Sequence, residues 1–266
     1  LWYTWDTGKA NIYELKINSN YFTALTETFG IKEVKLDSDK TFYLNSKKLF
    51  LRGTNIIPEQ FLSSLSTKRI KKLVSLIKEA NINAVRVHAH VNRKELYDEF
   101  DKQGIIIWQD FALQWTYEES PKFVANAVSQ IKDMVRQNYN HPSIAIWCCH
   151  NEPGEQIKTV DPFLYDAVLS EDTSRIIRLA SNYEEHPYDG WYWGKTEHYA
   201  AAPMGPLVTE FGAQAIPELK TLKRFMTDEE INTPCWDKWE YHDYQYETTN
   251  YIAKIDKGSD INAYIN

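Results

Sequence analysis

The chain of 266 residues has three cysteines, no long apolar run and no block of basic residues. No C-x-x-C pair is present, so the spacing typical of a zinc site or a redox dithiol is missing. Cys148 and Cys149 are neighbours on an expected strand and point to opposite faces, which disfavours a bond between them. With Cys235, they are expected to be structural thiols. No apolar segment approaches the roughly 20 residues of a membrane helix, so we expect no membrane contact.

The charge balance and the first residue restrict the partners further. The net charge is −7, and without a basic cluster nucleic acid is not an expected partner. The chain starts at Leu1 without a signal peptide, in the middle of an apparent strand, so we expect a fragment or a processed chain. The sequence therefore predicts neither a compartment nor an oligomeric state.

The first 50 residues alternate between apolar and polar side chains with a period of two, which is typical of β-strands. Asn45 and Ser46 are placed to form a hairpin turn. Fifty residues are too few for a sandwich. We therefore expect residues 1–40 to be the end of an upstream immunoglobulin-like β-sandwich and residues 41–266 to form a C-terminally truncated barrel domain.

After residue 50 the pattern changes to alternating strands and helices. Expected helices cover residues 68–80, 92–104 and 120–140, with Asn92 and Ser120 as N-caps, Pro121 in the first turn and Gly104 past a helix end. The intervening strands are continuous apolar runs, which indicates parallel strands buried on both faces. Successive βα units form either a doubly wound sheet or a barrel. No Gly-rich turn follows a strand, which favours an α/β fold of the (β/α)8 TIM type.

Polar residues follow the apolar strands, and in a barrel they meet at one mouth. They are Arg52, Asn55, Arg86, His88, His90, Trp108, Asp110, His150, Asn151, Glu152, Glu210 and Gln214. The strands expected over residues 144–152 and 205–214 each end with a glutamate. Two carboxylates across a pocket suit acetal cleavage, with retention at about 5–5.5 Å and inversion at about 6.5–9.5 Å. At this point either outcome stays open.

The segments "NHPSIAIWCCHNEP" and "LVTEFGAQ" resemble glycoside hydrolase family 2, a family of retaining (β/α)8 glycosidases. The resemblance implies that Glu152 is the acid/base, that Glu210 is the nucleophile and that Asn151 holds the sugar 2-hydroxyl. Arg86 matches an arginine near the nucleophile. Neither a metal nor an organic cofactor is implied.

Within the family, "TEFGAQ" and "IIIWQDF" look most like β-mannosidases, whereas "NHPSIAIW" and "NEP" are closer to β-galactosidases and β-glucuronidases. Mannosidases usually have Asn-Asn-Glu where this chain has His-Asn-Glu at residues 150–152. Asp110, His88 and Trp193 are added as expected sugar contacts. His88 can equally be structural, and Trp193 can equally be a core residue.

The last 40 residues are polar and aromatic with little helical period, and no eighth strand is visible. We leave open that the barrel lacks its last βα unit. The best prediction is a retaining exo-β-glycosidase that resembles β-mannosidases. An inactive carbohydrate-binding fragment is the rival, and a metal hydrolase using His88, His90 and Asp110 is a third alternative.

Overall fold

The computed structural model describes residues 1–21, 24–201, 207–232, 236–241, 245–255 and 261–265. The chain divides into two compact units, residues 1–185 and residues 186–266. Cys235 lies outside the described residues. In the part of the chain that the structure describes, no helix has the length and apolar character that a membrane crossing requires.

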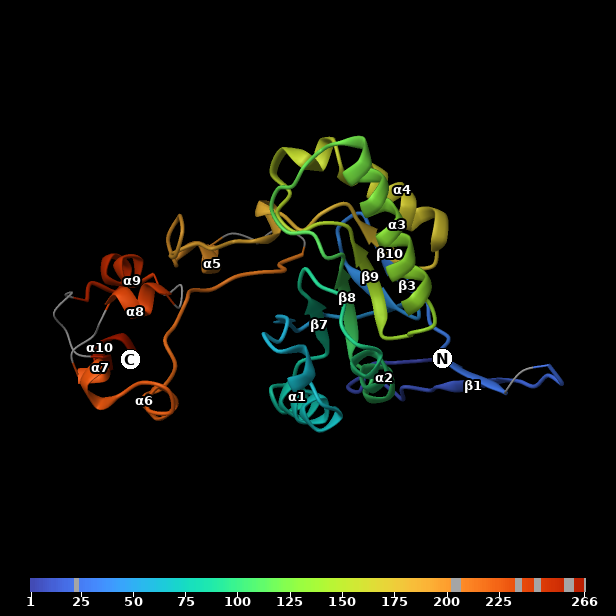
Figure 1. The fold of residues 1–266 in the computed structure, drawn as a ribbon, viewed down its shortest axis with the longest axis horizontal. Coiled ribbons are helices and arrows are strands. Elements are labelled where there is room, and N and C mark those ends of the chain that lie inside the picture. Colours follow the sequence, from blue (N-terminus) through green and yellow to red (C-terminus); the bar gives the residue numbers. More distant parts are fainter. Residues whose placement is uncertain (22–23, 202–206, 233–235, 242–244, 256–260, 266) are drawn as a thin grey trace. The chain divides into compact units, whose positions relative to one another are not determined.

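The centre of the first unit is a parallel sheet of five strands (Figure 1). The strands are β6 (Gly53–Ile56), β7 (Ala84–Val87), β8 (Ile106–Asp110), β9 (Ile144–Cys148) and β10 (Ile176–Arg178). Their spatial order is β10-β9-β8-β7-β6, so each strand pairs with its neighbour in sequence. A doubly wound sheet reverses its order at a switch point. The uninterrupted order is that of a barrel wall and confirms the predicted fold class.

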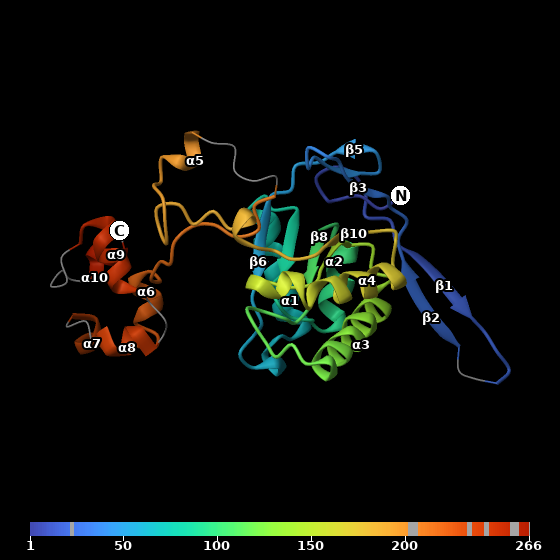
Figure 2. The same ribbon diagram turned by 90° about the horizontal axis from the view of Figure 1, so that it is seen from above.

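Four helices connect these strands: α1 (Thr67–Glu79), α2 (Lys94–Gln103), α3 (Pro121–Asn138) and α4 (Asp161–Glu171). Short 3-10 turns lie at Leu62–Ser64, Gly154–Lys158 and Tyr183–Glu185. In Figure 2, α1, α3 and α4 lie along the same side of the sheet. Val85, Val87 and Trp147 pack with helix residues in the core, whereas Arg86 and Cys148 point to the other face. All residues of β7, β8 and β9 are buried, as the apolar runs predict.

The helix ends follow the predicted signals with one exception. Ser120 caps α3 by accepting a hydrogen bond from the backbone N–H of Phe123. Gly104 ends α2 in the left-handed region at φ 68°. The prediction that Asn92 caps α2 is wrong, because Arg93 is the N-cap. The Asn92 side chain instead accepts from the backbone N–H of Arg93 at 2.8 Å, so the helix begins one residue later than expected.

The first 50 residues form antiparallel strands. A hairpin pairs β1 (Tyr13–Ile17) with β2 (Leu25–Phe29), and β3 (Val34–Leu36), β4 (Phe42–Leu44) and β5 (Lys47–Lys48) form a separate sheet. Asn45 and Ser46 join β4 to β5 with φ values of 50° and 62°. Positive φ at both central residues is the signature of a type I′ hairpin turn, which confirms the predicted turn. The assignment of residues 1–40 to an upstream sandwich stays a prediction.

The sheet β3-β4-β5 lies at the amino ends of the parallel strands. Lys32, two residues before β3, donates from Nζ to the carbonyl oxygen of Ile144, the first residue of β9, at 2.8 Å. Arg175 donates from Nε to the same oxygen at 2.9 Å. Functional sites of barrels lie at the opposite, carboxyl ends.

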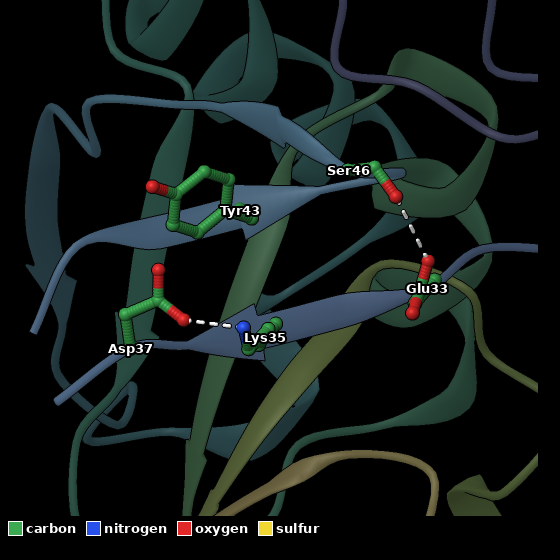
Figure 3. A pocket seen from close by; sticks show the side chains of 5 residues that line it. All are labelled: Glu33, Lys35, Asp37, Tyr43 and Ser46. Atoms are coloured by element: carbon green, nitrogen blue, oxygen red, sulfur yellow. Dashed lines mark hydrogen bonds and ion pairs between the residues drawn. The ribbon is translucent and has the colours of Figure 1, made fainter.

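A surface hollow of about 240 Å³ lies on this sheet and is lined by Glu33, Lys35, Asp37, Tyr43 and Ser46 (Figure 3). Lys35 pairs with Asp37 at 2.6 Å, and Ser46 donates to Glu33 at 3.3 Å. These side chains therefore bind one another at the amino ends of the parallel strands. Catalytic residues of barrels lie at the opposite ends, so we assign the hollow no catalytic role.

Lys32 makes the stability of the first unit depend on pH. Burial and the nearby Arg175 guanidinium lower the pKa of Lys32 well below its usual value of 10.5. Between the lowered pKa and 10.5, the unfolded chain binds a proton that the folded chain has released, so the free energy of unfolding rises with pH. Replacing Lys32 with Met should remove this rise, and Arg175 still donates to the Ile144 carbonyl.

Urea unfolding of wild type and Lys32→Met at about pH 7 and pH 9 checks the prediction, with a limiting slope of about 1.4 kcal/mol per pH unit. The other titrating groups are present in both proteins, and those that do not interact with Lys32 cancel in the difference. An equal pH dependence in both proteins would contradict the assignment.

The second unit contains short helices: α5 (His198–Ala201), α6 (Leu219–Leu222), α7 (Asp228–Asn232), α8 (Trp236–Tyr241), α9 (Tyr246–Ala253) and α10 (Ile261–Ile265). Four of them, α6, α7, α8 and α10, contribute to a core that consists of Ile216, Leu222, Ile231, Trp239, Ile261 and Tyr264. The last 40 residues, which show little helical period in the sequence, contain α7, α8, α9 and α10. Apolar residues spread over several short helices give no visible period in any one of them.

The strand expected over residues 205–214 is not formed in its described part, residues 207–214. Among the described residues of this unit, the strand pairing consists of one isolated bridge between Asp189 and Trp193. A parallel strand needs hydrogen-bonded neighbours for its backbone groups. An apolar run without such a neighbour stays extended without becoming a strand.

Candidate active site

Arg86, Asp110 and Asn151 form a connected network at the carboxyl ends of β7, β8 and β9. Arg86 donates from Nε to Oδ2 of Asp110 at 2.9 Å and lies 2.8 Å from the same oxygen through Nη2. The same Nη2 donates to Oδ1 of Asn151 at 2.6 Å. Arg86 lies in β7, Asp110 lies in β8 and Asn151 follows β9, so the parallel register of the three strands brings them together. The sequence predicted that these side chains meet at one edge, and they do.

The network is buried, and the charges of Arg86 and Asp110 are opposite. The side chain of Asp110 is 0% exposed and that of Arg86 is 4% exposed. Asp110 also accepts hydrogen bonds from the backbone N–H of Ala89 at 3.1 Å and from Nε1 of Trp108 at 2.8 Å. A buried carboxylate with a cation and two further donors is well compensated. Asp110 therefore holds Arg86 in place and lies below the surface.

Glu152 follows this network directly and has an unusual backbone. Its φ is 50°, in the left-handed region that non-glycine residues rarely adopt. Its N–H donates to the carbonyl of Ser181 at 2.8 Å, and the N–H of Asn151 donates to the carbonyl of Leu113 at 3.1 Å. These bonds tie the end of β9 to the segments that follow β8 and β10. They hold the half-buried Glu152 at the carboxyl edge of the sheet.

Strained backbone gathers at this edge. Ala89, Trp115 and Glu152 all have positive φ, at 50°, 64° and 50°, and each follows one of the strands β7, β8 and β9. Such residues cost roughly 1–3 kcal/mol each and cluster at functional sites. The backbone conformations of the loops after these strands therefore indicate a functional site and not a contribution to stability.

The side chain of Trp115 contacts the side chain of Glu152. Its indole Nε1 donates to Oε2 of Glu152 at 3.0 Å, and its backbone N–H donates to the carbonyl of Asn151 at 2.9 Å. The indole is 61% exposed. Sequence reasoning missed Trp115. The only available signal was its place in the loop after an expected strand.

Behind the edge, His150 and Asp161 form a buried pair, with His150 Nδ1 2.7 Å from Oδ1 of Asp161. Burial raises the pKa of Asp161, and the hydrogen bond with His150 works against the increase. The pair joins the end of β9 to the first residue of α4. The thiols of Cys148 and Cys149 are free and buried, and burial raises the pKa of both.

The histidines after β7 make local contacts. His90 Nδ1 lies 2.9 Å from the carbonyl oxygen of His88, and its Nε2 lies 2.9 Å from Nδ2 of Asn92. His88 is half-buried. With Asp110 bound to Arg86, the three proposed metal ligands do not form a ligand group among the described residues, and the metal-hydrolase alternative gains no support.

Arg52 was expected at the carboxyl end of its strand, and this is wrong. It precedes β6 and therefore lies at the amino end, where it pairs with Asp6 at 2.6 Å. Asn55 is inside β6 and half-buried. The error arises because the apolar run that ends at Leu51 was taken as the strand. The pairing with β7 begins only at Gly53, two residues later.

Glu210 lies in the second unit and is bound by two residues of that unit. Tyr188 donates from its hydroxyl to Oε2 of Glu210 at 2.6 Å, and Nε2 of the buried His186 lies 3.5 Å from Oε1. The ring of Trp193, which is 43% exposed, packs edge-on against Tyr188 at 5.7 Å between centroids. Sequence reasoning named Trp193 but missed Tyr188 and His186.

Comparisons with known proteins identify relatives of this chain. The model of the TIM barrel domain of glycosyl hydrolases family 2 matches residues 34–204. The β-mannosidase of Mus musculus is 29% identical over 232 residues, which cover 71% of this chain and 26% of the mouse protein. The β-glucuronidase of Bacteroides fragilis is 27% identical over 192 residues, which cover 64% of this chain and 28% of that protein.

Among solved structures, the β-D-mannosidase from Dictyoglomus thermophilum is similar, with a TM-score of 0.84 and 26% sequence identity. The match covers 100% of this chain and 38% of that chain. The chain thus spans 26% and 28% of the length of the two curated relatives. Because the family model matches more than half of the 266 residues, the chain belongs to glycosyl hydrolases family 2.

Proposed function

We propose that this chain is the catalytic part of a retaining exo-β-glycosidase, with Glu152 as acid/base and Glu210 as nucleophile. The observation that carries the proposal is the setting of Glu152. It stands at the carboxyl end of β9 with a strained backbone, next to the buried network of Arg86, Asp110 and Asn151. Catalytic residues of barrel enzymes come from the ends of strands at this face.

The proposed mechanism has two steps. Glu152 donates its proton to the glycosidic oxygen while a carboxylate oxygen of Glu210 attacks the anomeric carbon, and the bond to the leaving group breaks. Water then attacks the glycosyl-enzyme while Glu152 takes its proton, and the sugar leaves with retained configuration. This chemistry requires the two carboxyl groups to stand about 5–5.5 Å apart during turnover.

The surrounding groups fit these roles. A hydrogen bond to a carboxylate favours its ionised form, so the Tyr188 hydroxyl supports Glu210 as a nucleophile. Arg86 occupies Oδ1 of Asn151, which makes the Nδ2 amide the group that donates to the sugar 2-hydroxyl. We assign sugar contacts also to His88 and Trp193, whereas Asp110 acts through Arg86.

The substrate we propose is a terminal β-mannoside. The mouse and Dictyoglomus relatives are β-mannosidases by name. A glucuronide carries a carboxylate that needs a cation, and the Arg86 charge is already neutralised by Asp110. A β-glucuronide or a β-galactoside is the alternative within the family, favoured by the similarity to the Bacteroides enzyme.

The test is hydrolysis of five p-nitrophenyl β-glycosides: mannoside, galactoside, glucuronide, glucoside and glucosaminide. We expect release from the mannoside, with β-mannose as the first product anomer in a proton NMR time course. Release of p-nitrophenol from another glycoside of the panel would change the proposed sugar and leave the proposed mechanism unchanged. An α-anomer as first product would exclude retention.

No release from any of the five would favour the inactive carbohydrate-binding fragment. Glu152→Gln then separates the two classes, because the enzyme hypothesis predicts that binding survives while turnover is lost. Sugar binding without turnover in the wild type would overturn the enzyme hypothesis.

A further inference from the structure

Trp115 has three properties that stability does not explain. Its φ of 64° places a bulky residue in the left-handed region, which is sterically unfavourable for any residue with a Cβ atom. Its ring is 61% exposed, so the side chain gains little from burial. Its indole N–H is nevertheless fixed on Oε2 of Glu152 at 3.0 Å.

The loop around Trp115 is anchored on both sides. The Trp115 N–H binds the Asn151 carbonyl at 2.9 Å, and the Gln114 N–H binds the Tyr117 hydroxyl at 3.2 Å. Tyr117 exchanges two hydrogen bonds with the Gln156 side chain, from its N–H at 3.0 Å and to its carbonyl at 2.5 Å. Trp115 is thus held in a high-energy conformation by contacts to the segment that carries Glu152.

The contact also distinguishes the two carboxyl oxygens of Glu152. Oε2 accepts the indole N–H, so a proton on this carboxyl group belongs on Oε1. In the proposed reaction, that proton moves from Oε1 to the glycosidic oxygen as the bond to the anomeric carbon breaks. The electron pair of that bond stays on the departing oxygen. A side chain that touches the acid/base therefore lies beside the leaving group.

We propose that Trp115 forms the leaving-group subsite. Its exposed ring face stacks on the sugar or aryl group that departs, and its N–H keeps the proton of Glu152 on Oε1. This inference rests on the proposed function, since it assigns a role toward the acid/base of that reaction. The chemical class of ligand is a neutral pyranose or aromatic aglycone, whose apolar face suits an indole.

Two variants separate the contribution of the aromatic ring from that of the indole N–H group. Trp115→Phe keeps an aromatic face and loses the hydrogen bond, whereas Trp115→Ala loses both. Phe163→Ala, which removes a 57% exposed aromatic from α4, is the matched control. Circular dichroism of each variant checks that the fold is kept.

The substrates are β-1,4-mannobiose and 2,4-dinitrophenyl β-mannoside, and the leaving group of the second needs no proton. For Trp115→Phe we expect kcat/KM on the disaccharide to fall about 10- to 100-fold, the range for a hydrogen bond to a charged group. The kcat/KM for the dinitrophenyl glycoside, which reports glycosyl-enzyme formation without proton donation, should be unaffected. For Trp115→Ala we expect in addition a rise in KM for the disaccharide. The control variant should match the wild type on both substrates.

A binding measurement keeps the proposal testable without turnover. Calorimetry of the disaccharide is compared between Glu210→Ala and the double variant Glu210→Ala with Trp115→Ala, and we expect weaker binding in the second. Hydrolysis that is unchanged in both Trp115 variants overturns the subsite and leaves the proposed function intact. Absent hydrolysis with Trp115-dependent binding overturns the proposed function and supports the stacking role. Absent hydrolysis with equal binding overturns both.

Discussion

Glu152→Ala and Glu210→Ala are expected to yield glycosyl azides of opposite anomeric configuration when azide is added to a β-glycoside. Without azide, removal of the acid/base should slow cleavage of an unactivated substrate about 10²- to 10⁴-fold. Removal of the nucleophile should abolish turnover on every substrate, because no glycosyl-enzyme forms. These are the largest effects on activity that the proposed function predicts.

The azide products follow from the roles of the two carboxylates. In Glu210→Ala, azide takes the place of the missing nucleophile and displaces the leaving group once, which gives an α-azide. In Glu152→Ala, an activated substrate still forms the glycosyl-enzyme with Glu210. Azide then attacks the face where water would attack, and two displacements give a β-azide. Proton NMR of the isolated product reads the anomer directly.

Glu155→Ala is the matched control. Glu155 lies three residues after Glu152, its side chain is 87% exposed, and it pairs with Lys158 at 2.6 Å. We expect wild-type activity and no azide product from this variant. The same azide anomer from the Glu152 and Glu210 variants, or a rate loss in Glu155→Ala of the same size, would contradict the assignment of roles.

The parallel wall could be predicted from the sequence because its signals are local. A strand buried on both faces needs an unbroken apolar run, and residues 144–148 provide one that the structure buries completely. The hairpin at Asn45 and Ser46 and the cap at Ser120 depend on residue types within a few positions of each other. Arg86, Asp110 and Asn151 meet because each lies near the carboxyl end of a strand. In a parallel sheet, these ends lie side by side at one edge.

The missed features depend on contacts that residue types do not specify. Trp115 contacts Glu152 across 37 residues, and both residues have left-handed backbone that their residue types do not predict. The expected strand over residues 205–214 is apolar enough, but strand formation depends on neighbours that the segment itself does not encode. Tyr188 was passed over because the aromatic residues around it offered equivalent candidates for stacking.

Replacing Arg86 with Met is expected to lower the free energy of unfolding by about 3–5 kcal/mol, because it leaves the Asp110 carboxylate buried without a cation. Met has a similar length and keeps the apolar packing, so the loss measures the charge and its hydrogen bonds. Asn151 also loses its donor at Oδ1. Urea unfolding followed by near-ultraviolet circular dichroism measures the change.

Two further variants identify the cause. Arg69→Met removes an exposed ion pair, Arg69 with Glu59 at 2.7 Å, and should cost about 0–1 kcal/mol. Adding Asp110→Asn to Arg86→Met removes the buried charge and keeps an acceptor oxygen for one of the two donors, Ala89 N–H or Trp108 Nε1, so it should restore part of the stability. A double variant no more stable than Arg86→Met would show that packing around the guanidinium, and not the uncompensated carboxylate, governs the loss. Partial recovery would show that the loss in Arg86→Met comes from the buried Asp110 side chain left without its cation.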